Sequence, residues 1–354
     1  MTAMKAQVYR GAQQLCFEDI DPPDLEPGDV LIQVVATGIA PQDINHCAAT
    51  VGEWPRIFGR EIVGTIARCD PTVQGWTEGQ RVAVRSRVPC LQCDDCLSER
   101  FSACAGYRSQ ISTAGLIPSG GGFAEFVRVP KYLVDRGGLW AIPSSVSWEQ
   151  ALFLDPVQRC LGAIARADLK PGQLVWILGA GSLGSILALI LHRFGIRTVI
   201  TDMSPDRLDR ARDLNAGTVI PSVYDDLHTK IQSFTNSKGA DAAIITIPTR
   251  HCLHHAIDGT RRGGKLILLC DDPFNRMQSI DPCLFSRREL SLSAGFTLAV
   301  RQRYLAEELI CDRRLPLEQT VSHRYSLEDL PIAIDRAMAE ITDTVKLVVY
   351  PQLK

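Results

Sequence analysis

The sequence predicts an α/β protein that combines a doubly wound parallel sheet with a second, β-rich domain. From about residue 148 onward, short apolar strands alternate with helix-like segments, which is the pattern of βαβ units around a parallel sheet. Before that point, alternating β-branched runs follow one another with turn residues between them. The length of 354 residues is sufficient for two hydrophobic cores.

Three strands are predicted in the first 150 residues from alternating, β-branched sequence. They cover residues 29–37, 61–67 and 80–84 and are separated by turns such as Pro27-Gly28 and Glu78-Gly79. The alternation is typical of strands that bury one face, so this part of the chain is expected to be a β domain.

The second half reads as strands and helices in turn. A strand at residues 173–178 precedes a helix at 182–194, and a strand at 198–201 precedes a helix at 204–214 with Ser204 as N-cap and Pro205 in its first turn. Further strands are expected at residues 218–220, 240–247, 265–270, 290–294 and 344–350, and further helices at 301–311 and 327–340.

Composition and charge exclude several classes of protein. With 45% hydrophobic and 22% charged residues, the chain resembles ordinary globular proteins. The net charge of -2 is spread without blocks of like charge, so neither nucleic acid nor a membrane surface is an expected partner. The apolar run at residues 183–191 is shorter than the ~20 residues of a membrane span. Because no apolar signal segment is visible at the amino terminus, we expect a cytoplasmic protein whose 12 cysteines are mostly reduced.

A glycine-rich turn between the predicted strand at 173–178 and the following helix predicts a dinucleotide site. Glycines in such a turn let the backbone approach a pyrophosphate, which then faces the helix N-terminus. A carboxylate at the end of the next strand, Asp202, would bind the ribose hydroxyls and repel a 2′-phosphate, which favours NAD(H) over NADP(H). The alternative is a glycine turn that binds nothing. The residues of the predicted site are Gly179, Gly181, Ser182, Leu183, Gly184, Asp202 and the flanking Arg207.

Four cysteines are crowded into one short segment at Cys90, Cys93, Cys96 and Cys104. Thiolates at this spacing can converge on one Zn²⁺, and a shell of four sulfurs leaves no position for water, so such a zinc would be structural. Disulfides are disfavoured in a reducing compartment, and an iron–sulfur cluster is the remaining alternative. We expect one structural zinc ion per chain.

These motifs resemble those of the medium-chain dehydrogenase/reductase superfamily, and most closely its zinc-containing alcohol, sorbitol and threonine dehydrogenases. Residues 121–127, Gly-Gly-Phe-Ala-Glu-Phe-Val, and residues 344–346, Thr-Val-Lys, add to the resemblance. It implies a GroES-like catalytic domain at residues 1–150, with 295–354 returning to it, and a Rossmann domain at 151–294. It also implies that Lys346 contacts the cofactor pyrophosphate. Members of the superfamily commonly pair the last Rossmann strand across a two-fold axis, so a homodimer or homotetramer is expected.

The catalytic zinc ligands of the superfamily are largely missing from this sequence. The family motif G-I-C-G-[ST]-D is matched by residues 38–43, where the zinc-binding cysteine becomes Ala40 and the proton-relay hydroxyl becomes Gln42. The relay histidine is matched by Asn45, with His46 one residue out of register, and the histidine of G-H-E is matched by Arg60. We therefore predict no catalytic zinc.

Two possible oxygen ligands remain, Glu61 and Asp155, and a relocated metal site that uses His46 or Cys47 is the alternative. Arg60, Glu61, Asp155 and His46 are the candidate catalytic residues. Arg60 is expected to pair with Glu61 and Asp155, and Arg159, one helical turn after Asp155, could complete the network. The cluster is interpreted either as a structural replacement of the metal or as a source of hydrogen-bond donors for a small-molecule substrate.

The predicted function is an NAD(H)-dependent oxidoreductase without catalytic zinc that reduces an iminium, an enone or an activated carbonyl in specialised metabolism. One alternative is a non-enzymatic NAD-binding sensor or scaffold, and another is a conventional alcohol or polyol dehydrogenase with a rearranged site. A quinone-reductase-like activity is a further option, although those relatives usually lack a four-cysteine lobe.

Overall fold

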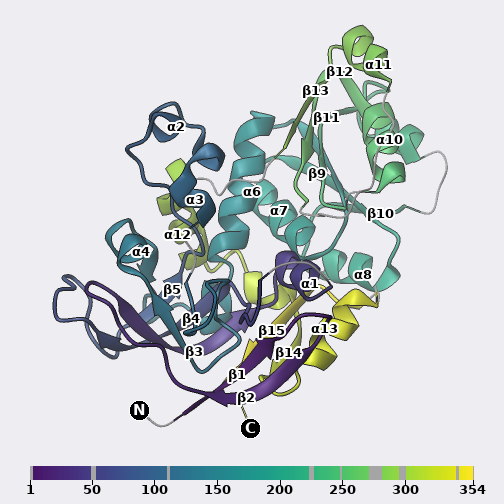
Figure 1. Ribbon diagram of the computed structural model, residues 1–354. Helices are drawn as coiled ribbons and strands as arrows, with labels where there is room; N and C mark the ends of the chain where they lie inside the picture. The colour runs from purple at the N-terminus through teal and green to yellow at the C-terminus, as the bar shows by residue number, and fades with distance from the viewer. Residues whose placement is uncertain are drawn as a thin grey trace. The chain divides into compact units, whose positions relative to one another are not determined.

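The computed structural model describes residues 3–48, 53–109, 112–222, 227–247, 249–270, 281–294, 300–339 and 343–353 (Figure 1). The chain forms two compact units, and their bounds are Met1–Asp155, Val321–Ile341 and Lys346–Lys354 for the first and Pro156–Thr320 and Thr342–Val345 for the second. Within the described ranges, no helix is long and apolar enough to cross a membrane.

These bounds differ from the expected domain bounds in two places. The first unit ends at residue 155 instead of 150, and the chain returns to it at residue 321 instead of 295, a residue outside the described ranges. The reason is that residues 300–320 pack on the second unit. There the 3₁₀ helix η3 (Leu317–Thr320) contacts α7 (Ser182–Arg193), and Asp312 pairs with Arg193 at 2.9 Å.

The first unit is built on a seven-stranded sheet in which β14, β15, β3, β4, β5 and β7 follow one another and β6 also pairs with β3. The three strands predicted in the first 150 residues are confirmed. A separate antiparallel pair, β1 with β2, was not predicted. The strands are β1 (Met4–Tyr9), β2 (Leu15–Ile20), β3 (Val30–Gly38), β4 (Glu61–Cys69), β5 (Arg81–Val84), β6 (Phe126–Val129), β7 (Leu139–Ala141), β14 (Val321–Ser326) and β15 (Lys346–Tyr350).

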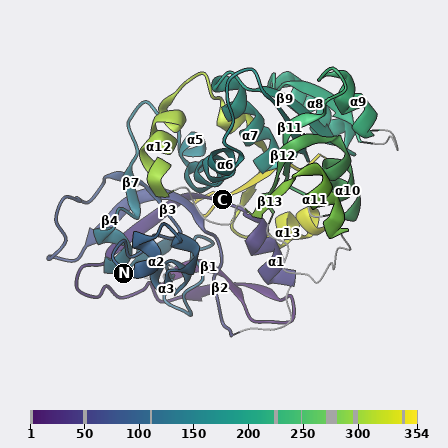
Figure 2. The ribbon, with the colours of Figure 1, turned by 90° about the horizontal axis from the view of Figure 1, so that it is seen from above.

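Short helices connect these strands. The first of them, α1, begins directly after β3, and Asp43 caps its start by accepting a hydrogen bond from the Ala40 amide at 3.0 Å. Helices α2 and α3 lie beside each other in the lobe that carries the four cysteines (Figures 1 and 2). The helices of the unit are α1 (Pro41–Ala48), α2 (Asp94–Leu97), α3 (Ala105–Ser109), α4 (Lys131–Asp135), α5 (Trp148–Ala151) and α13 (Leu330–Met338).

The second unit contains a six-stranded, wholly parallel sheet with the order β10–β9–β8–β11–β12–β13. The first strand of the unit, β8, lies in the middle, and the chain winds outward from it in both directions. This is the predicted doubly wound topology, in which ligands bind at the carboxyl ends of the strands where the winding reverses. The strands are β8 (Leu174–Leu178), β9 (Arg197–Asp202), β10 (Thr218–Pro221), β11 (Ala240–Ile245), β12 (Thr260–Leu268) and β13 (Ser291–Ala294).

Helices cover both faces of this sheet. Helix α7 lies on one face, and α10 lies on the other with α11 beside it (Figure 2). The N-cap prediction for α8 is confirmed, because the Ser204 hydroxyl accepts from the Arg207 amide at 3.2 Å. The helices are α6 (Leu154–Ala167), α7, α8 (Pro205–Asp213), α9 (Leu227–Ser233), α10 (Arg250–Gly259), α11 (Pro282–Arg288) and α12 (Arg303–Cys311).

Helix α6 is the longest element that the strand and helix assignments omitted. Its face toward the protein interior contains Gln158 and Arg159, which are 2% and 8% exposed. Because these buried positions are polar, the apolar periodicity that identifies a core-facing helix is interrupted.

Candidate functional site

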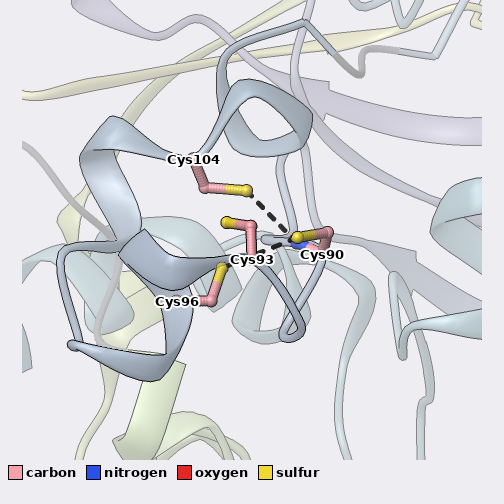
Figure 3. Close-up of side chains that lie close together, drawn as sticks. All are labelled: Cys90, Cys93, Cys96 and Cys104. Atoms are coloured by element: carbon pink, nitrogen blue, oxygen red, sulfur yellow. Dashed lines mark hydrogen bonds between the residues drawn. The ribbon is translucent and has the colours of Figure 1, made fainter.

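The four-cysteine lobe brings its thiols together as the spacing predicts. The sulfur atoms of Cys90, Cys93, Cys96 and Cys104 all lie within 4.8 Å of one another, and Figure 3 shows them pointing toward a common centre. Two of them come from the loop before α2, one from α2 and one from the turn before α3. Within the described part of the chain, no other group of three or more Cys, His, Asp or Glu side chains is gathered this closely.

The spacing of these thiols fits a zinc ion. In a tetrahedron with Zn–S bonds of about 2.3 Å, neighbouring sulfurs are separated by about 3.8 Å, and the sulfurs of Cys90 and Cys96 are 3.8 Å apart. The Cys90 amide also donates to the Cys104 sulfur at 3.4 Å. Amide donors at Gln92 and Cys93 lower the pKa of Cys90 to about 6, whereas burial raises the pKa of Cys96 to about 12, so the fit to zinc rests on the spacing of the sulfur atoms. The four donors leave no position for water or substrate.

The glycine turn has the form of a phosphate cradle. Gly179 adopts φ +110°, a backbone conformation that residues other than glycine avoid. A Cβ at Gly184 would collide with the Gly179 carbonyl oxygen, so the third glycine allows α7 to pack closely against the turn. A Cβ at Gly181 would meet no protein atom within 4 Å. The open side of the turn, at the first turn of α7 with Ser182 and Leu183, therefore fits a pyrophosphate.

Asp202 ends β9 beside this turn and is only 4% exposed. Its Oδ2 accepts from the Ala180 amide at 2.7 Å and its Oδ1 from the Ser204 amide at 2.9 Å. These amide donors fix the carboxylate at the carboxyl end of the sheet, and each oxygen keeps a second lone pair for a ribose hydroxyl. The position is the one predicted for a ribose-binding residue.

Arg207 and Lys346, the two basic residues predicted to bind the cofactor, have different partners. Arg207 lies in the first turn of α8, and its Nε donates to the Thr344 carbonyl at 3.0 Å. Lys346 is 3% exposed, donates to the Ile39 carbonyl at 3.0 Å and forms a very short ion pair with Glu61. Glu61 thus neutralises the ammonium group of Lys346 and the Ile39 carbonyl solvates it, and the expected contact of Lys346 with the cofactor pyrophosphate stays a prediction.

The resemblance places Arg60 where its relatives have a zinc-binding histidine, and the contacts of Arg60 differ from the expected ones. Its Nη1 lies 3.7 Å from Oδ1 of Asp43, a fully buried carboxylate that also accepts from the Gly59 amide at 3.1 Å. Its Nη2 lies 3.3 Å from Nδ1 of His46. The pairing of Arg60 with Glu61 is corrected, since Glu61 points to Lys346, and Asp43 supplies a counter-charge that sequence reasoning missed.

His46 lies on α1 and is exposed. Its ring stacks on Phe58 with a centroid distance of 5.4 Å and an interplanar angle of 15°. Desolvation lowers the pKa of His46, the Arg60 cation lowers it further, and Asp43 opposes both effects. His46 is therefore brought together with Arg60 although it is out of register with the family's relay histidine.

Glu61 and Asp155 occupy separate hydrogen-bonded positions. Burial raises the pKa of Glu61, and the Lys346 ammonium opposes this shift. Asp155 lies in the first turn of α6, and its Oδ2 accepts from both the Ser86 amide at 3.1 Å and the Ser86 hydroxyl at 2.5 Å. Ser86 was not predicted as a partner of Asp155. The only related signal in the sequence is the predicted end of a strand at residue 84, two residues before it.

The comparisons with known proteins agree with this arrangement. Residues 26–136 match the family model of the alcohol dehydrogenase GroES-like domain, and residues 182–306 match that of the zinc-binding dehydrogenases. A sorbitol dehydrogenase from Bacillus subtilis is 29% identical over 98% of this chain and 97% of its own length.

Two solved structures share the fold over nearly the whole chain. A zinc-binding dehydrogenase from Sinorhizobium meliloti bound to NADP has a TM-score of 0.85 at 21% identity and covers 99% of this chain and 100% of its own. An alcohol dehydrogenase from Escherichia coli complexed with NADH has a TM-score of 0.84 at 19% identity and covers 99% and 100%. These two structures show the fold. The two family models, the full-length relative and the four-cysteine cluster show that the chain belongs to the zinc-containing medium-chain dehydrogenase/reductase superfamily of oxidoreductases.

Proposed function

We propose that this protein is an NAD(H)-dependent oxidoreductase that reduces a small molecule without a catalytic zinc ion. The observation that carries the proposal is the Arg60 cluster. At the position of a zinc-binding histidine, the chain has a guanidinium group that contacts His46 and Asp43. A permanent cation repels Zn²⁺ and offers it no lone pair.

The other members of the former ligand set are equally unsuited to a metal. Ala40, at the cysteine position, is 4% exposed and offers only a methyl group. Glu61 is paired with Lys346, and one oxygen of Asp155 already accepts two hydrogen bonds from Ser86. A catalytic zinc site needs three good ligands around an open position, and this set of side chains does not supply them.

A dinucleotide would be held by the turn at Gly179–Gly184 and the first turn of α7, with its adenosine ribose on Asp202. When bound, it supplies the hydride for reduction or accepts it in the reverse direction. Asp202 favours NAD(H), because its buried negative charge would repel the 2′-phosphate of NADP(H). Arg207 donates its Nε to Thr344, which supports the same preference.

The substrates that suit this site are those that need no Lewis acid. An iminium is already electrophilic, and an enone or activated carbonyl needs only donors toward its oxygen. Arg60 presents such donors, and the resulting stabilisation of negative charge replaces part of the zinc ion's field. The structural zinc at Cys90, Cys93, Cys96 and Cys104 would stabilise the lobe and take no part in the chemistry.

Two other functions are kept as candidates. A polyol dehydrogenase with a relocated metal site is favoured by the full-length similarity to a sorbitol dehydrogenase. A non-enzymatic NAD-binding sensor would share the nucleotide site and lack turnover.

Metal content and turnover of the purified protein distinguish the three. The proposal expects one zinc per chain and NADH oxidation with members of a panel of imines, enones and ketones. Two tightly bound zinc ions per chain with polyol oxidation would favour the dehydrogenase. Tight NADH binding without any turnover across the panel would favour the sensor.

A further inference from the structure

We infer that Ser185 is a positioning residue that aims the Gly181 amide at the pyrophosphate of a bound dinucleotide. Its hydroxyl holds the carbonyl oxygen of the peptide bond between Ala180 and Gly181, and the rigidity of that peptide turns the N–H of Gly181 the opposite way. That the turn binds a dinucleotide rests on the proposed function, whereas the orientation of the peptide rests on contacts of the chain itself.

Ser185 is a buried polar residue in an apolar stretch of α7. The residues from Ile186 to Leu191 are all apolar and buried, and Ser185 is itself 1% exposed. A buried hydroxyl needs a hydrogen-bond partner. The Oγ of Ser185 donates to the Ala180 carbonyl at 3.1 Å, and its amide donates to the Gly181 carbonyl at 2.9 Å. One residue thus holds two consecutive carbonyl groups of the glycine turn.

The contact with the hydroxyl fixes the direction of the Gly181 amide. A trans peptide is planar, so its C=O and N–H groups point in opposite directions. Because the Ala180 carbonyl points to Ser185, the N–H of Gly181 points away from it. Among the described contacts this N–H has no protein acceptor, and a Cβ at Gly181 would meet no atom within 4 Å. An unpaired amide beside open space at a helix N-terminus is suited to an anionic oxygen.

Ala180 is held on its other side as well. It is fully buried, and its N–H donates to Oδ2 of Asp202 at 2.7 Å. The peptide before it is also fixed, since the Gly179 amide donates to the Thr201 carbonyl at 2.7 Å. The peptide planes of the turn are therefore set before a ligand arrives, which lowers the entropy cost of binding. Asp202 and Ser185 act on the two sides of one residue, so the ribose-binding carboxylate and the Gly181 amide are placed by the same short backbone segment.

A hydroxyl that serves stability alone is the competing explanation. Serine side chains in helices often donate to a backbone carbonyl of the preceding turn without any ligand being involved. The two explanations differ in which ligands are affected when the hydroxyl is removed. A stability role affects all ligands of the site alike, whereas a positioning role affects only ligands that carry the pyrophosphate.

NMR of the full-length protein tests the direction of the amide. The chain has 27 glycines, so ¹⁵N-glycine labelling gives a limited set of amide signals, and the signal missing from Gly181→Ala assigns residue 181. Inorganic pyrophosphate and ADP-ribose should both move its proton resonance downfield, because an N–H that donates to an anionic oxygen is deshielded. Adenosine, which has no phosphate, should leave it in place. A Gly181 signal that does not move when ADP-ribose binds would overturn the inference.

Binding measurements on Ser185→Ala test the role of the hydroxyl. The affinity for ADP-ribose should fall by about tenfold, the scale of a weakened hydrogen bond to a charged group. The affinity for adenosine, measured by competition, should stay the same, and the Gly181 shift that pyrophosphate induces should shrink. Equal losses for ADP-ribose and adenosine, or no loss for either, would show a stability role and refute the positioning role.

Thr198→Val is the matched control. The Thr198 hydroxyl is 5% exposed and donates to the Ala216 carbonyl at 3.0 Å, and it lies at the start of β9, at the opposite end of the parallel sheet from the glycine turn. Its removal should lower stability about as much as Ser185→Ala does and should leave both affinities unchanged. A comparable loss of ADP-ribose affinity in the control would refute a specific role of Ser185. If Ser185→Ala does not fold, the Gly181 signal of the wild-type protein still decides the question.

Different outcomes would refute the inference and the proposed function. Binding of ADP-ribose with the Gly181 shift, but without NADH oxidation across the substrate panel, would refute the proposed reduction and leave the inference standing. NADH oxidation together with an unmoved Gly181 signal would do the reverse. A wild-type protein that binds neither pyrophosphate nor ADP-ribose would refute both.

Discussion

The four-cysteine lobe and the Arg60 cluster are the two places where the resemblance to zinc-containing dehydrogenases implies a zinc ion, and their side chains differ sharply. In the lobe, all four thiols remain and converge within 4.8 Å. In the Arg60 cluster, a methyl group and a guanidinium stand where the resemblance implies zinc ligands, and the nearby carboxylates have hydrogen-bonded partners of their own. If the proposed function holds, the difference has a physical reason, because a closed metal shell contributes folding energy only as a whole, whereas an open metal site can change residue by residue.

Removing one thiol from the lobe should have the largest effect on zinc content and stability. Cys96→Ala should release the zinc ion and unfold the lobe, because the ion's binding energy is folding energy there. Zinc analysis and thermal unfolding measure the two effects. Cys311→Ala, which removes an exposed cysteine outside the cluster, is the matched control and should change neither. Retention of one zinc per chain in Cys96→Ala would contradict the assigned ligand set.

The ion pair of Lys346 with Glu61 tests whether the rebuilt site is held by charge. Lys346→Met leaves the Glu61 carboxylate buried without its cation, which should cost about 3–5 kcal/mol of unfolding free energy. Denaturant unfolding measures this loss, and Glu61→Gln in the same protein should recover part of it. Lys5→Met, which removes a largely exposed pair with Asp19, should cost at most about 1 kcal/mol.

The loss in Lys346→Met should depend on pH in a defined direction. Burial raises the pKa of Glu61, and removing the ammonium that opposes this shift raises it further. A carboxyl group whose pKa is higher in the folded than in the unfolded state binds more protons when folded, so folding is favoured as pH falls. The penalty should therefore shrink from pH 7 toward the ordinary glutamate pKa of about 4.3. A penalty that grows on acidification would show that Glu61 remains ionised.

The nucleotide site resembles the lobe and differs from the Arg60 cluster, because it keeps the residues expected from the sequence motifs. Asp202→Asn keeps the size of the side chain and removes its charge, so NADH affinity should fall by about tenfold or more, on the scale of a hydrogen bond to a charged group. The affinity for NADPH should fall less, so the ratio of NADH affinity to NADPH affinity should decrease. Titration calorimetry with both cofactors measures the difference. Equal affinities for NADH and NADPH in the unmodified protein would contradict the role of Asp202.

The smallest effect concerns assembly. Strand β13 lies at the edge of the parallel sheet, and Leu292 on it is 40% exposed. An edge with unpaired backbone groups and an exposed leucine favours pairing with a second copy. Light scattering should show a multiple of the 39.0 kDa chain mass, and Leu292→Lys should shift the equilibrium toward monomer. A wild-type monomer at micromolar concentration would refute the expected homodimer or homotetramer.

Local patterns predicted most of the fold and the two retained sites. The glycine turn, the N-cap at Ser204 and the cysteine spacing are encoded by neighbouring residues, so their geometry follows from sequence distance alone. The Arg60 cluster could not be read in this way. Asp43 meets Arg60 because α1 folds back on the turn at Gly59, and Lys346 meets Glu61 because β15 at the far end of the chain pairs with β3. Such ion pairs are set by tertiary contacts, and the charges of these residues alone would allow several other combinations of partners.

The place of β15 in the first sheet also has a consequence for how the protein is made. β3 pairs with β15, which is synthesised after every strand of the parallel sheet, because β15 begins at residue 346 and those strands lie between residues 174 and 294. The parallel sheet can therefore form during synthesis while the end of β3 at Thr37 and Gly38 still lacks its partner on one edge. Because unpaired strand edges promote misassociation of nascent chains, truncations that remove the last strand should aggregate although most of the chain is intact.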